Sequence, residues 1–351
     1  MSSWRSASSP LENITQAVAS RPDIAARALQ KKYLLSVIIP CHNESSNIAP
    51  LFERTRTALE HTGQFWEMIF INDGSTDDTL LQLLSLRERE NCITVIDLSR
   101  NFGKEAALTA GLDHARGDVA IPLDADLQDP PELIPELFAK FLEGYDVVNA
   151  QRLHRDGEPL AKRLSSFLFY RLLGRISNIT IPQDTGDYRL LSRRVLDALQ
   201  RMPERRRYMK GLFAWTGFRS TSVAYRREAR HTGRSNWNYW RLGQLAIEGI
   251  TSFSHVPLQL ASFSGMIIAL SSFLYAAYLV IETLLYGNSV KGYPSLMVAV
   301  LFLGGMQLLA LGIIGEYLSR SYEESKQRPI YLVQDTWSSP IENTDIQQEN
   351  A

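Results

Sequence analysis

The stretch LLSVIIP at residues 34–40 is a continuous apolar run that ends at a proline. Such a run is typical of a strand that is covered on both faces of a parallel sheet. Short apolar runs and amphipathic segments then alternate along the chain. Their periods predict helices at 47–61, 77–87 and 104–115, and further strands at 68–71, 93–98 and 119–123. This alternation predicts right-handed crossovers and an open, mostly parallel α/β sheet.

The segments that follow the four strands are the first places to look for a binding site. In open α/β sheets, ligands bind beyond the carboxyl ends of the strands. Polar residues cluster in all four of the corresponding segments, which are 41–44, 72–79, 99–104 and 124–132. These segments are therefore the candidates for the ligand-binding residues.

The segment DADLQDPPE at residues 124–132 carries the sharpest chemical signal. In an extended chain, Asp124, Asp126 and Gln128 would point to one side, so that two carboxylates and an amide oxygen converge. Hard oxygen ligands suit Mg²⁺ or Mn²⁺, which keep several waters and bridge to substrate phosphates. A solvated acidic turn, or a helix N-cap before the two prolines, would also explain these residues.

The segment NDGSTD at residues 72–77 leads from a strand through a turn into a helix. Helix capping by Ser75 or Thr76 is the simpler explanation. Alternatively, Asp73 accepts a hydrogen bond from a base or ribose while Gly74 allows close approach. The sequence has neither the dinucleotide-binding glycine pattern nor a P-loop, which argues against both of those enzyme classes. A diphosphate would then have to be held by a metal and by arginines.

The composition excludes several other classes. The 351 residues include 37 Lys and Arg and 38 Asp and Glu, a net charge of −1 that gives no support to bulk nucleic-acid binding. Charged residues make up 21% and hydrophobic residues 45%, which excludes a disordered chain. Cys41 and Cys92 form no disulfide framework, and the six histidines show no metal-ligand spacing.

Two uncharged runs near the C-terminus, 256–281 and 292–315, are long enough to cross a membrane. We expect helices at 262–285 and 294–317 that form a transmembrane hairpin; two buried core helices are the alternative. Arg241 precedes the pair, and Arg320, Lys326 and Arg328 follow it. The positive-inside rule then places both ends in the cytoplasm. The absence of an apolar N-terminal signal segment agrees with a cytosolic domain.

The region before the first apolar run is basic and aromatic. Residues 201–241 hold eleven basic and two acidic residues, with Trp215, Trp237, Tyr239 and Trp240 among them. This mixture suits the level of lipid headgroups, and a nucleic-acid patch is the alternative. Residues 239–253 have helical apolar spacing, which indicates an interfacial helix or an ordinary core helix. Upstream, we expect a helix at 160–176 and a loop at 182–187.

Several motifs in a fixed order connect the chain to a known family. They are VIIP at 37–40 with Asn43-Glu44, NDGS at 72–75, RNFGKE at 100–105 and DADLQDP at 124–130. In this order they resemble glycosyltransferase family 2. The segments GDYRL at 186–190, MPER at 202–205, EGITSFS at 248–254, GYPS at 292–295 and GEY at 315–317 are similar to the polyprenyl-phosphate glycosyltransferase subgroup, bactoprenol glucosyltransferases above all. The resemblance covers residues 33–332.

The resemblance implies a GT-A fold and inverting transfer of a hexose to undecaprenyl phosphate at the cytoplasmic membrane face. The expected donor is UDP-glucose, with Mg²⁺ or Mn²⁺ as cofactor, and the lipid-linked sugar would serve O-antigen or cell-envelope glycan modification. Alternatives are a polyprenyl-phosphate mannosyl- or N-acetylhexosaminyltransferase, and a non-catalytic membrane scaffold that retains a sugar-nucleotide domain. A processive polysaccharide synthase is less expected, because two spans cannot readily form a translocation channel. Relatives also suggest a homo-oligomer.

Composition, apolar spacing and the resemblance together divide the chain into five parts. We expect a loose N-terminal tail at 1–32, the catalytic domain at 33–237 and an interfacial amphipathic helix at 238–256. Two transmembrane helices at 257–318 and a cytosolic C-terminal tail at 319–351 complete the chain.

Site residues follow from matching positions. Pro40, Glu44, Asp73 and Lys104 would bind the nucleotide sugar, Asp124 the ribose or metal, and Asp126 and Gln128 the metal. The chain departs from the family pattern at Asn72, where many relatives have Asp.

The residues for the acceptor are chosen on their chemistry. A phosphate monoester is already ionised at neutral pH, so the enzyme needs no strong general base. Arg227, Arg230 and Ser235 are the candidates for holding this phosphate, because guanidinium groups suit its oxygens; a solvated basic face is the alternative. Asp187 is the candidate for orienting the sugar or acceptor, and a turn aspartate after Gly186 is the alternative.

Overall fold

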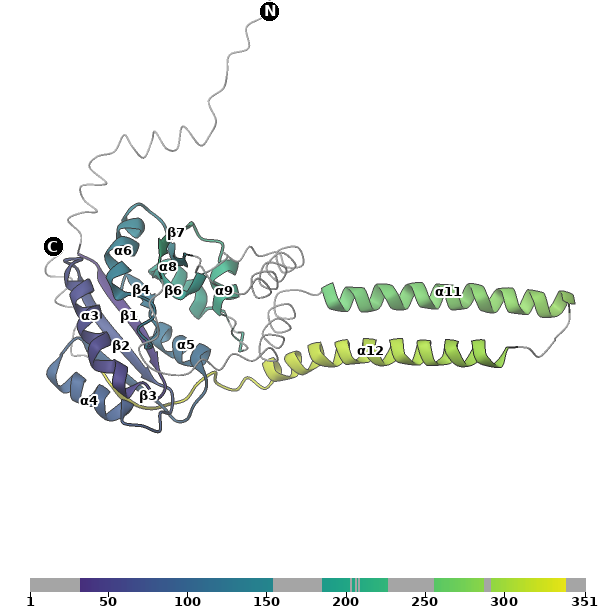
Figure 1. Ribbon diagram of the computed structural model, residues 1–351, viewed down its shortest axis with the longest axis horizontal. Helices are drawn as coiled ribbons and strands as arrows, with labels where there is room; N and C mark the ends of the chain where they lie inside the picture. The colour runs from purple at the N-terminus through teal and green to yellow at the C-terminus, as the bar shows by residue number, and fades with distance from the viewer. Residues whose placement is uncertain are drawn as a thin grey trace, which may run out of the picture.

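The strand β1 (Leu34–Cys41) lies inside an eight-stranded sheet in the computed structural model of the chain (Figure 1). The structure describes residues 32–153, 185–202, 204–205, 207, 209–226, 256–286 and 292–338. Every residue of β1 except Pro40 is buried, as expected for a strand that is covered on both faces. The apolar run at residues 34–40 therefore forms the predicted strand.

The sheet is mostly parallel, as the sequence predicted. On one side of β1 lies β4 (Val119–Pro122); on the other lie β2 (Phe65–Asn72) and then β3 (Ile93–Leu98), all parallel. Beyond β4 come the antiparallel β6 (Thr185–Ser192), then β5 (Val147–Arg152), then β7 (Ser220–Tyr225). The full order is β7-β5-β6-β4-β1-β2-β3-β8, in which β8 is Val333–Trp337.

Helices cover both faces of the sheet and bury two apolar clusters. On one face, α3 (Ile48–Glu60), α4 (Thr79–Arg89) and α6 (Ile134–Leu142) pack against alternate strand residues. On the other face lie α5 (Lys104–His114), α8 (Arg193–Gln200) and α9 (Met209–Trp215). Short 3₁₀ turns at Ser45–Asn47 and Pro131–Leu133 precede α3 and α6. Each large side chain that is fully buried contributes about 1.5–3 kcal/mol.

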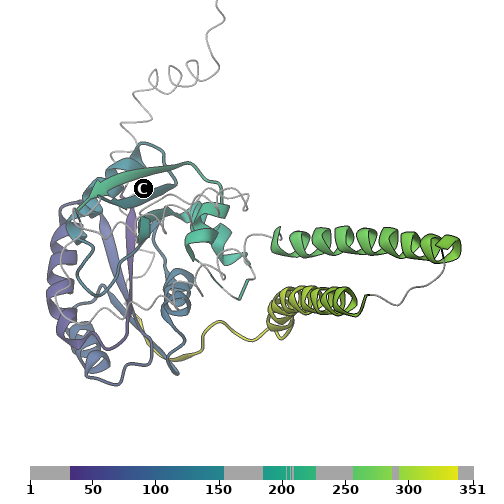
Figure 2. The same ribbon diagram turned by 45° about the vertical axis from the view of Figure 1, so that its right-hand side comes forward.

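Two long helices project from the domain. Helices α11 (Val256–Tyr286) and α12 (Tyr293–Ser325) run antiparallel (Figure 1 and Figure 2) and contact each other. Both are longer than the predicted 262–285 and 294–317. An i,i+4 ion pair between Arg320 and Glu316, with Nη2–Oε1 at 3.0 Å, supports the extra turns of α12. Among the described residues, Phe302–Ser325 is long and apolar enough to cross a membrane, and its window is not buried in the protein.

Two sequence expectations need correction. Asp187 lies on strand β6, not in a loop, because residues from Thr185 onward pair with β5. The C-terminal part is not merely a tail, because β8 (Val333–Trp337) joins the sheet antiparallel to β3. The helices expected at 160–176 and 239–253 lie outside the described residues.

Candidate active site

A pocket of about 360 Å³ opens at the carboxyl ends of the four parallel strands. Six of the predicted site residues line it: Pro40, Glu44, Asp73, Lys104, Asp124 and Asp126. They come from the ends of β1, β2 and β4 and from the start of α5. Residues of all four polar segments that follow the parallel strands therefore meet at one pocket.

Close packing of two turns shapes one wall of this pocket. Gly74 has φ +61°, and a Cβ there would lie 2.4 Å from the backbone nitrogen of Asn101, so a side chain does not fit. The neighbouring Asp73 is 3% exposed, and its carboxylate accepts the amide hydrogens of Phe102 at 2.7 Å and Gly103 at 2.9 Å. Asp73 thus holds the loop after β3 against the end of β2. Its contact with a nucleoside stays a prediction.

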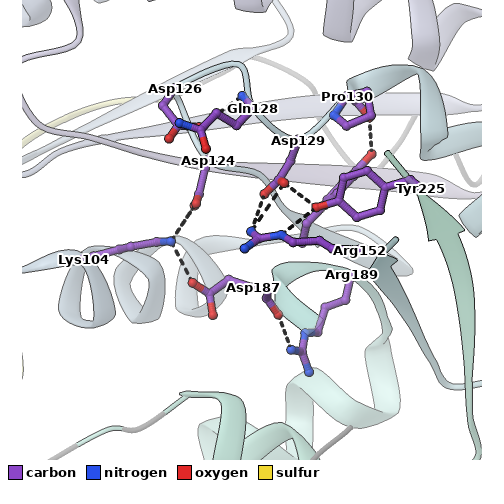
Figure 3. A network of polar contacts seen from close by, with 12 residues as sticks. Lys104, Asp124, Asp126, Gln128, Asp129, Pro130, Arg152, Asp187, Arg189 and Tyr225 are labelled. Atoms are coloured by element: carbon purple, nitrogen blue, oxygen red, sulfur yellow. Dashed lines mark hydrogen bonds and ion pairs between the residues drawn. The ribbon is translucent and has the colours of Figure 1, made fainter. Parts of the chain in front are cut away.

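Lys104 links two carboxylates across the site. Its Nζ lies 2.7 Å from Oδ1 of Asp124 and 2.7 Å from Oδ2 of Asp187 (Figure 3). Burial works to lower the pKa of Lys104, but the charges of Asp124 and Asp187 outweigh it and raise that pKa. Lys104 therefore keeps two anions together, and a cation at this point also suits an anionic substrate.

Asp187 is held in its ionised form. Burial works to raise its pKa, but Lys104 and then Lys210 outweigh this effect, and the pKa falls to about 2. Arg189 adds to the same effect and donates from Nη2 to the carbonyl oxygen of Gly186 at 2.6 Å. Within the described residues, Oδ1 of Asp187 is buried without a hydrogen-bond partner. A buried acceptor of this kind is available to a ligand hydroxyl or amide.

The segment after β4 forms a turn, so the extended geometry predicted for residues 124–128 is wrong. Leu127 has φ +59°, an unusual left-handed conformation for a leucine. The amide of Gln128 donates to Oδ1 of Asp126 at 3.2 Å, which fixes the turn. Asp124 and Asp126 still line the pocket, whereas Gln128 is 8% exposed and is not among the lining residues. The assignment of Gln128 to a metal stays a prediction.

A buried polar network supports this turn from behind. Asp129 is 1% exposed and accepts a hydrogen bond from the hydroxyl of Tyr225 and, at 3.4 Å, from Nη2 of Arg152 (Figure 3). Arg152 also donates from Nε to the Tyr225 oxygen at 3.0 Å. Tyr188 donates its hydroxyl to the carbonyl oxygen of Pro130 at 2.9 Å. Sequence reasoning missed these partners because they lie on β5, β6 and β7, far along the chain.

Of the other lining residues, three have side chains that can take part in hydrogen bonding, and sequence reasoning missed them: Cys41, His42 and Asn101. Nδ1 of His42 lies 2.9 Å from the carbonyl oxygen of Asp73, and Asn101 Nδ2 lies 3.1 Å from His42 Nε2. Their positions inside the motifs at 37–44 and 100–105 were the available signal. The spacing of the histidines gives His42 no role, because it does not match a metal-ligand pattern.

Asn72, where the chain departs from the family pattern, forms a hydrogen bond with Asp97. Its Nδ2 donates to Oδ1 of Asp97 at 2.7 Å, and both residues are buried. An aspartate at 72 would place two carboxylates in contact, which is unfavourable without a proton or cation between them. The amide of Asn72 is therefore compatible with the neighbouring Asp97, whereas a carboxylate at this position would repel it.

Glu105 gives the first testable prediction. Burial, followed by the charge of Asp187, raises the pKa of Glu105 to about 7. The folded protein therefore holds a proton that the unfolded chain releases near pH 4.5, and the associated stability is present below pH 4.5 and lost as pH rises to about 7. We expect Glu105→Gln to stabilise the domain at pH 8 by on the order of 1 to 3 kcal/mol and to have little effect at pH 4.5.

Thermal unfolding at both pH values measures this effect. Glu88→Gln, at an exposed position of α4, is the control. A stabilisation by Glu105→Gln that is the same at both pH values would contradict the assignment.

The residues of the pocket fit a divalent cation that shares its coordination with a substrate. Asp124 and Asp126 offer hard carboxylate oxygens at the pocket wall. No group of three or more His, Cys, Asp or Glu suited to a metal occurs in the described part of the chain. Mg²⁺ commonly uses one or two carboxylates, with waters and substrate phosphates completing its coordination. Arg227, Arg230 and Ser235 lie outside the described residues.

This arrangement, an open α/β sheet with paired aspartates beyond its strand ends, defines the GT-A class of nucleotide-sugar enzymes. The family model for glycosyl transferase family 2 matches residues 36–200, and the model for a GtrB C-terminal hairpin matches residues 256–321. A Synechocystis protein named as an uncharacterized glycosyltransferase is 52% identical over 86% of this chain and 95% of its own length. The bactoprenol glucosyl transferase of Shigella phage SfV is 44% identical over 85% of this chain and 97% of its own.

The chain therefore belongs to glycosyltransferase family 2 and is a glycosyltransferase. Among solved structures, the glucosyl-3-phosphoglycerate synthase of Mycobacterium tuberculosis, in complex with Mn²⁺, UDP and glucosyl-3-phosphoglycerate, is similar with a TM-score of 0.41 and 19% identity. That similarity covers 71% of this chain and 84% of the synthase. The apolar helix Phe302–Ser325 and the matched hairpin indicate association with a membrane.

Proposed function

We propose that the protein transfers a hexose from a UDP-sugar, most simply UDP-glucose, to undecaprenyl phosphate at the cytoplasmic face of a membrane. The observation that carries the proposal is the convergence of Asp124, Asp126 and Lys104 at one pocket. Asp187 lies 2.7 Å from Lys104, and the chain continues into long apolar helices. The bactoprenol glucosyl transferases at 44% identity support the polyprenyl acceptor. The lipid-linked product would serve modification of an O-antigen or another envelope glycan.

The chemistry is a single displacement with inversion. An oxygen of the acceptor phosphate forms a bond to the anomeric carbon as the bond from that carbon to the UDP oxygen breaks. The phosphate is already ionised, so the protein has to hold and orient two anions and needs no strong base. A Mg²⁺ or Mn²⁺ ion held by Asp124, Asp126 and Gln128 would neutralise charge on the leaving diphosphate.

The remaining residues have binding roles in this proposal. Pro40, Glu44 and Asp73 bind the nucleoside at the pocket wall, and Lys104 binds phosphate oxygens. Asp187, whose Oδ1 faces no protein partner among the described residues, accepts a hydrogen bond from the sugar or orients the acceptor. We assign the acceptor phosphate to a second group: Arg227, Arg230 and Ser235.

The membrane arrangement is part of the proposal. Both α11 and α12 would cross the bilayer, so that the protein is multi-pass and its catalytic domain faces the cytoplasm. Residues 33–237 would be the catalytic domain, 238–256 an interfacial helix, 257–318 the membrane hairpin, and 319–351 a cytosolic end. A homo-oligomer is expected from the relatives.

Transfer of radiolabelled sugar tests the proposal. UDP-glucose, UDP-galactose, UDP-N-acetylglucosamine and GDP-mannose are supplied separately to the full-length protein in vesicles that contain undecaprenyl phosphate, with Mg²⁺ or with EDTA. We expect UDP-glucose to give one labelled lipid that EDTA abolishes. If another donor labels the lipid instead, that donor's sugar is the one transferred and the assignment of glucose is wrong. UDP binding without any labelled lipid would favour the scaffold, and a long labelled polymer would favour a synthase.

A further inference from the structure

The C-terminal segment Tyr331–Trp337 lies beyond the residues that either family model matches. Residues 326–330 lead from the end of α12 to this segment, which runs along the edge of the sheet and forms β8 beside β3 (Figure 1). We propose that this segment, the C-terminal strap, positions the loop that carries Asn101, Gly103 and Lys104 into the donor pocket. The role of the pocket rests on the proposed function, whereas the mechanical role of the strap does not.

The strap holds β3 at the point where it turns into the pocket loop. The register places Ile96 opposite Thr336, and the amide of Ser99 donates to the carbonyl oxygen of Leu332 at 3.0 Å. Ser99 is the first residue after β3, two residues before Asn101. Without the strap, β3 would be an edge strand and the Ser99 amide would lose this partner.

The strap also holds the far end of α5. The hydroxyl of Tyr331 donates to Oδ2 of Asp113 at 3.0 Å, and its ring lies 6.5 Å from that of His114. Lys104 is the first residue of this helix, and Asp113 lies in its last turn. The strap therefore fixes both the strand before the pocket loop and the helix after it.

Both ends of the strap pack into the protein, on opposite faces of the sheet. Tyr331 packs against the cluster beneath α5, α8 and α9, and Trp337 packs against the cluster beneath α3 and α4. Beyond Trp337, Nη2 of Arg87 donates to the carbonyl oxygen of Ser338 at 2.9 Å. A segment held at both ends and along one strand resists displacement more than a strand that pairs by its backbone alone.

A short linker joins the strap to the membrane-associated helix. Helix α12 ends at Ser325 and the strap begins at Tyr331, so residues 326–330 are the whole connection. The end of α12 also touches the domain, because Oε1 of Glu324 accepts the amide hydrogen of Arg205 at 2.8 Å. The strap thus connects the base of the hairpin to the donor pocket.

One cross-strand pair between the strap and β3 is unfavourable. Removing it gives a variant that should bind the strap more tightly, the opposite of the loosening variants. Asp335 lies directly opposite Asp97, and like charges in such a pair weaken strand association. Asp335 is exposed, so Asp335→Asn removes this repulsion without disturbing the core. We expect that variant to tighten the strap, whereas Tyr331→Phe loosens it.

Amide hydrogen exchange of the full-length protein without substrate tests the proposal. The reporters are the amides of Phe102 and Gly103, which donate to Asp73. We expect exchange to accelerate about 10-fold when the chain stops after Arg328 and about 3-fold in Tyr331→Phe, and to slow or stay equal in Asp335→Asn. Tyr322→Phe, at an exposed tyrosine of α12, is the matched control and should match the wild type.

Kinetics supply the second readout. A loosened pocket loop should raise the donor KM about 5- to 10-fold in the shortened chain, while the acceptor KM changes less than about 2-fold.

Unchanged exchange at Phe102 and Gly103 would overturn the proposal. Equal acceleration across β1 and β4 would overturn it too, because it would mean general destabilisation. If the shortened chain does not fold, Tyr331→Phe against Tyr322→Phe decides. Exchange needs no substrate, so it distinguishes failure of the strap from failure of the proposed donor.

Discussion

Asp126→Asn should lower the rate of sugar transfer at least about 100-fold while the protein stays folded. Asp126 lines the pocket, and in the proposed mechanism its carboxylate holds the cation that neutralises the leaving diphosphate. Asparagine keeps an oxygen that can accept the Gln128 amide hydrogen, so the turn should survive. The loss should therefore appear in kcat and in the metal concentration needed for half-maximal rate.

The measurement is transfer at several Mg²⁺ concentrations, with thermal unfolding of the same preparations. Asp78→Asn, at an exposed aspartate before α4, is the control for removing one negative charge near the sheet. Near-normal turnover by Asp126→Asn at low Mg²⁺ would contradict the assignment of Asp126 to the metal.

Lys104→Met should have a comparable effect for a different reason. Removing the ammonium leaves Asp124 and Asp187 near each other without the cation that lies 2.7 Å from both. Uncompensated like charges in a partly buried site are costly, so we expect kcat/KM to fall about 100-fold at pH 7. The methionine keeps most of the side-chain volume, which limits the loss of packing.

The pH dependence separates this effect from simple misfolding. In the wild type Asp187 has a pKa of about 2, and Lys104 is the first cause of that depression. Without Lys104 the pKa of Asp187 rises, so the carboxylate is protonated at higher pH than in the wild type. We expect the acidic limb of kcat/KM to move to higher pH in Lys104→Met.

Lys104→Arg should restore part of the activity and return the limb toward the wild-type position. Lys140→Met is the control, because Lys140 pairs with Glu143 on the surface of α6. An acidic limb of Lys104→Met at the wild-type pH would contradict the role of Lys104.

Much of the sheet followed from the sequence because its parallel strands are buried on both faces. Apolar runs such as the one at 34–40 can form such strands with few alternatives, and the strand predicted at 93–98 has the observed bounds. The four polar segments after these strands met at one pocket, since the carboxyl ends of parallel strands share an edge. Here local pattern and overall fold agree.

The geometry of the aspartate segment at 124–128 could not be predicted from the sequence. The alternation argument assumed an extended chain, whereas Leu127 adopts a left-handed conformation inside a turn. That turn is supported by Asp129 and its partners Arg152 and Tyr225, which stand on other strands. No local pattern reports such support, because it arises only when β5 and β7 come together.

Local periodicity and short motifs are enough to establish the family, the parallel half of the sheet and the residue types that gather at the pocket. Contacts between distant groups depend instead on how the chain folds. Examples are the bridge from Lys104 to Asp124 and Asp187, and the pairing of residues 333–337 with the sheet edge. An exposed five-residue strand has little apolar pattern of its own. It forms because its backbone pairs with hydrogen-bonding groups of β3 that would otherwise be unpaired at the sheet edge. In addition, Tyr331 and Trp337 pack against apolar clusters on opposite faces of the sheet.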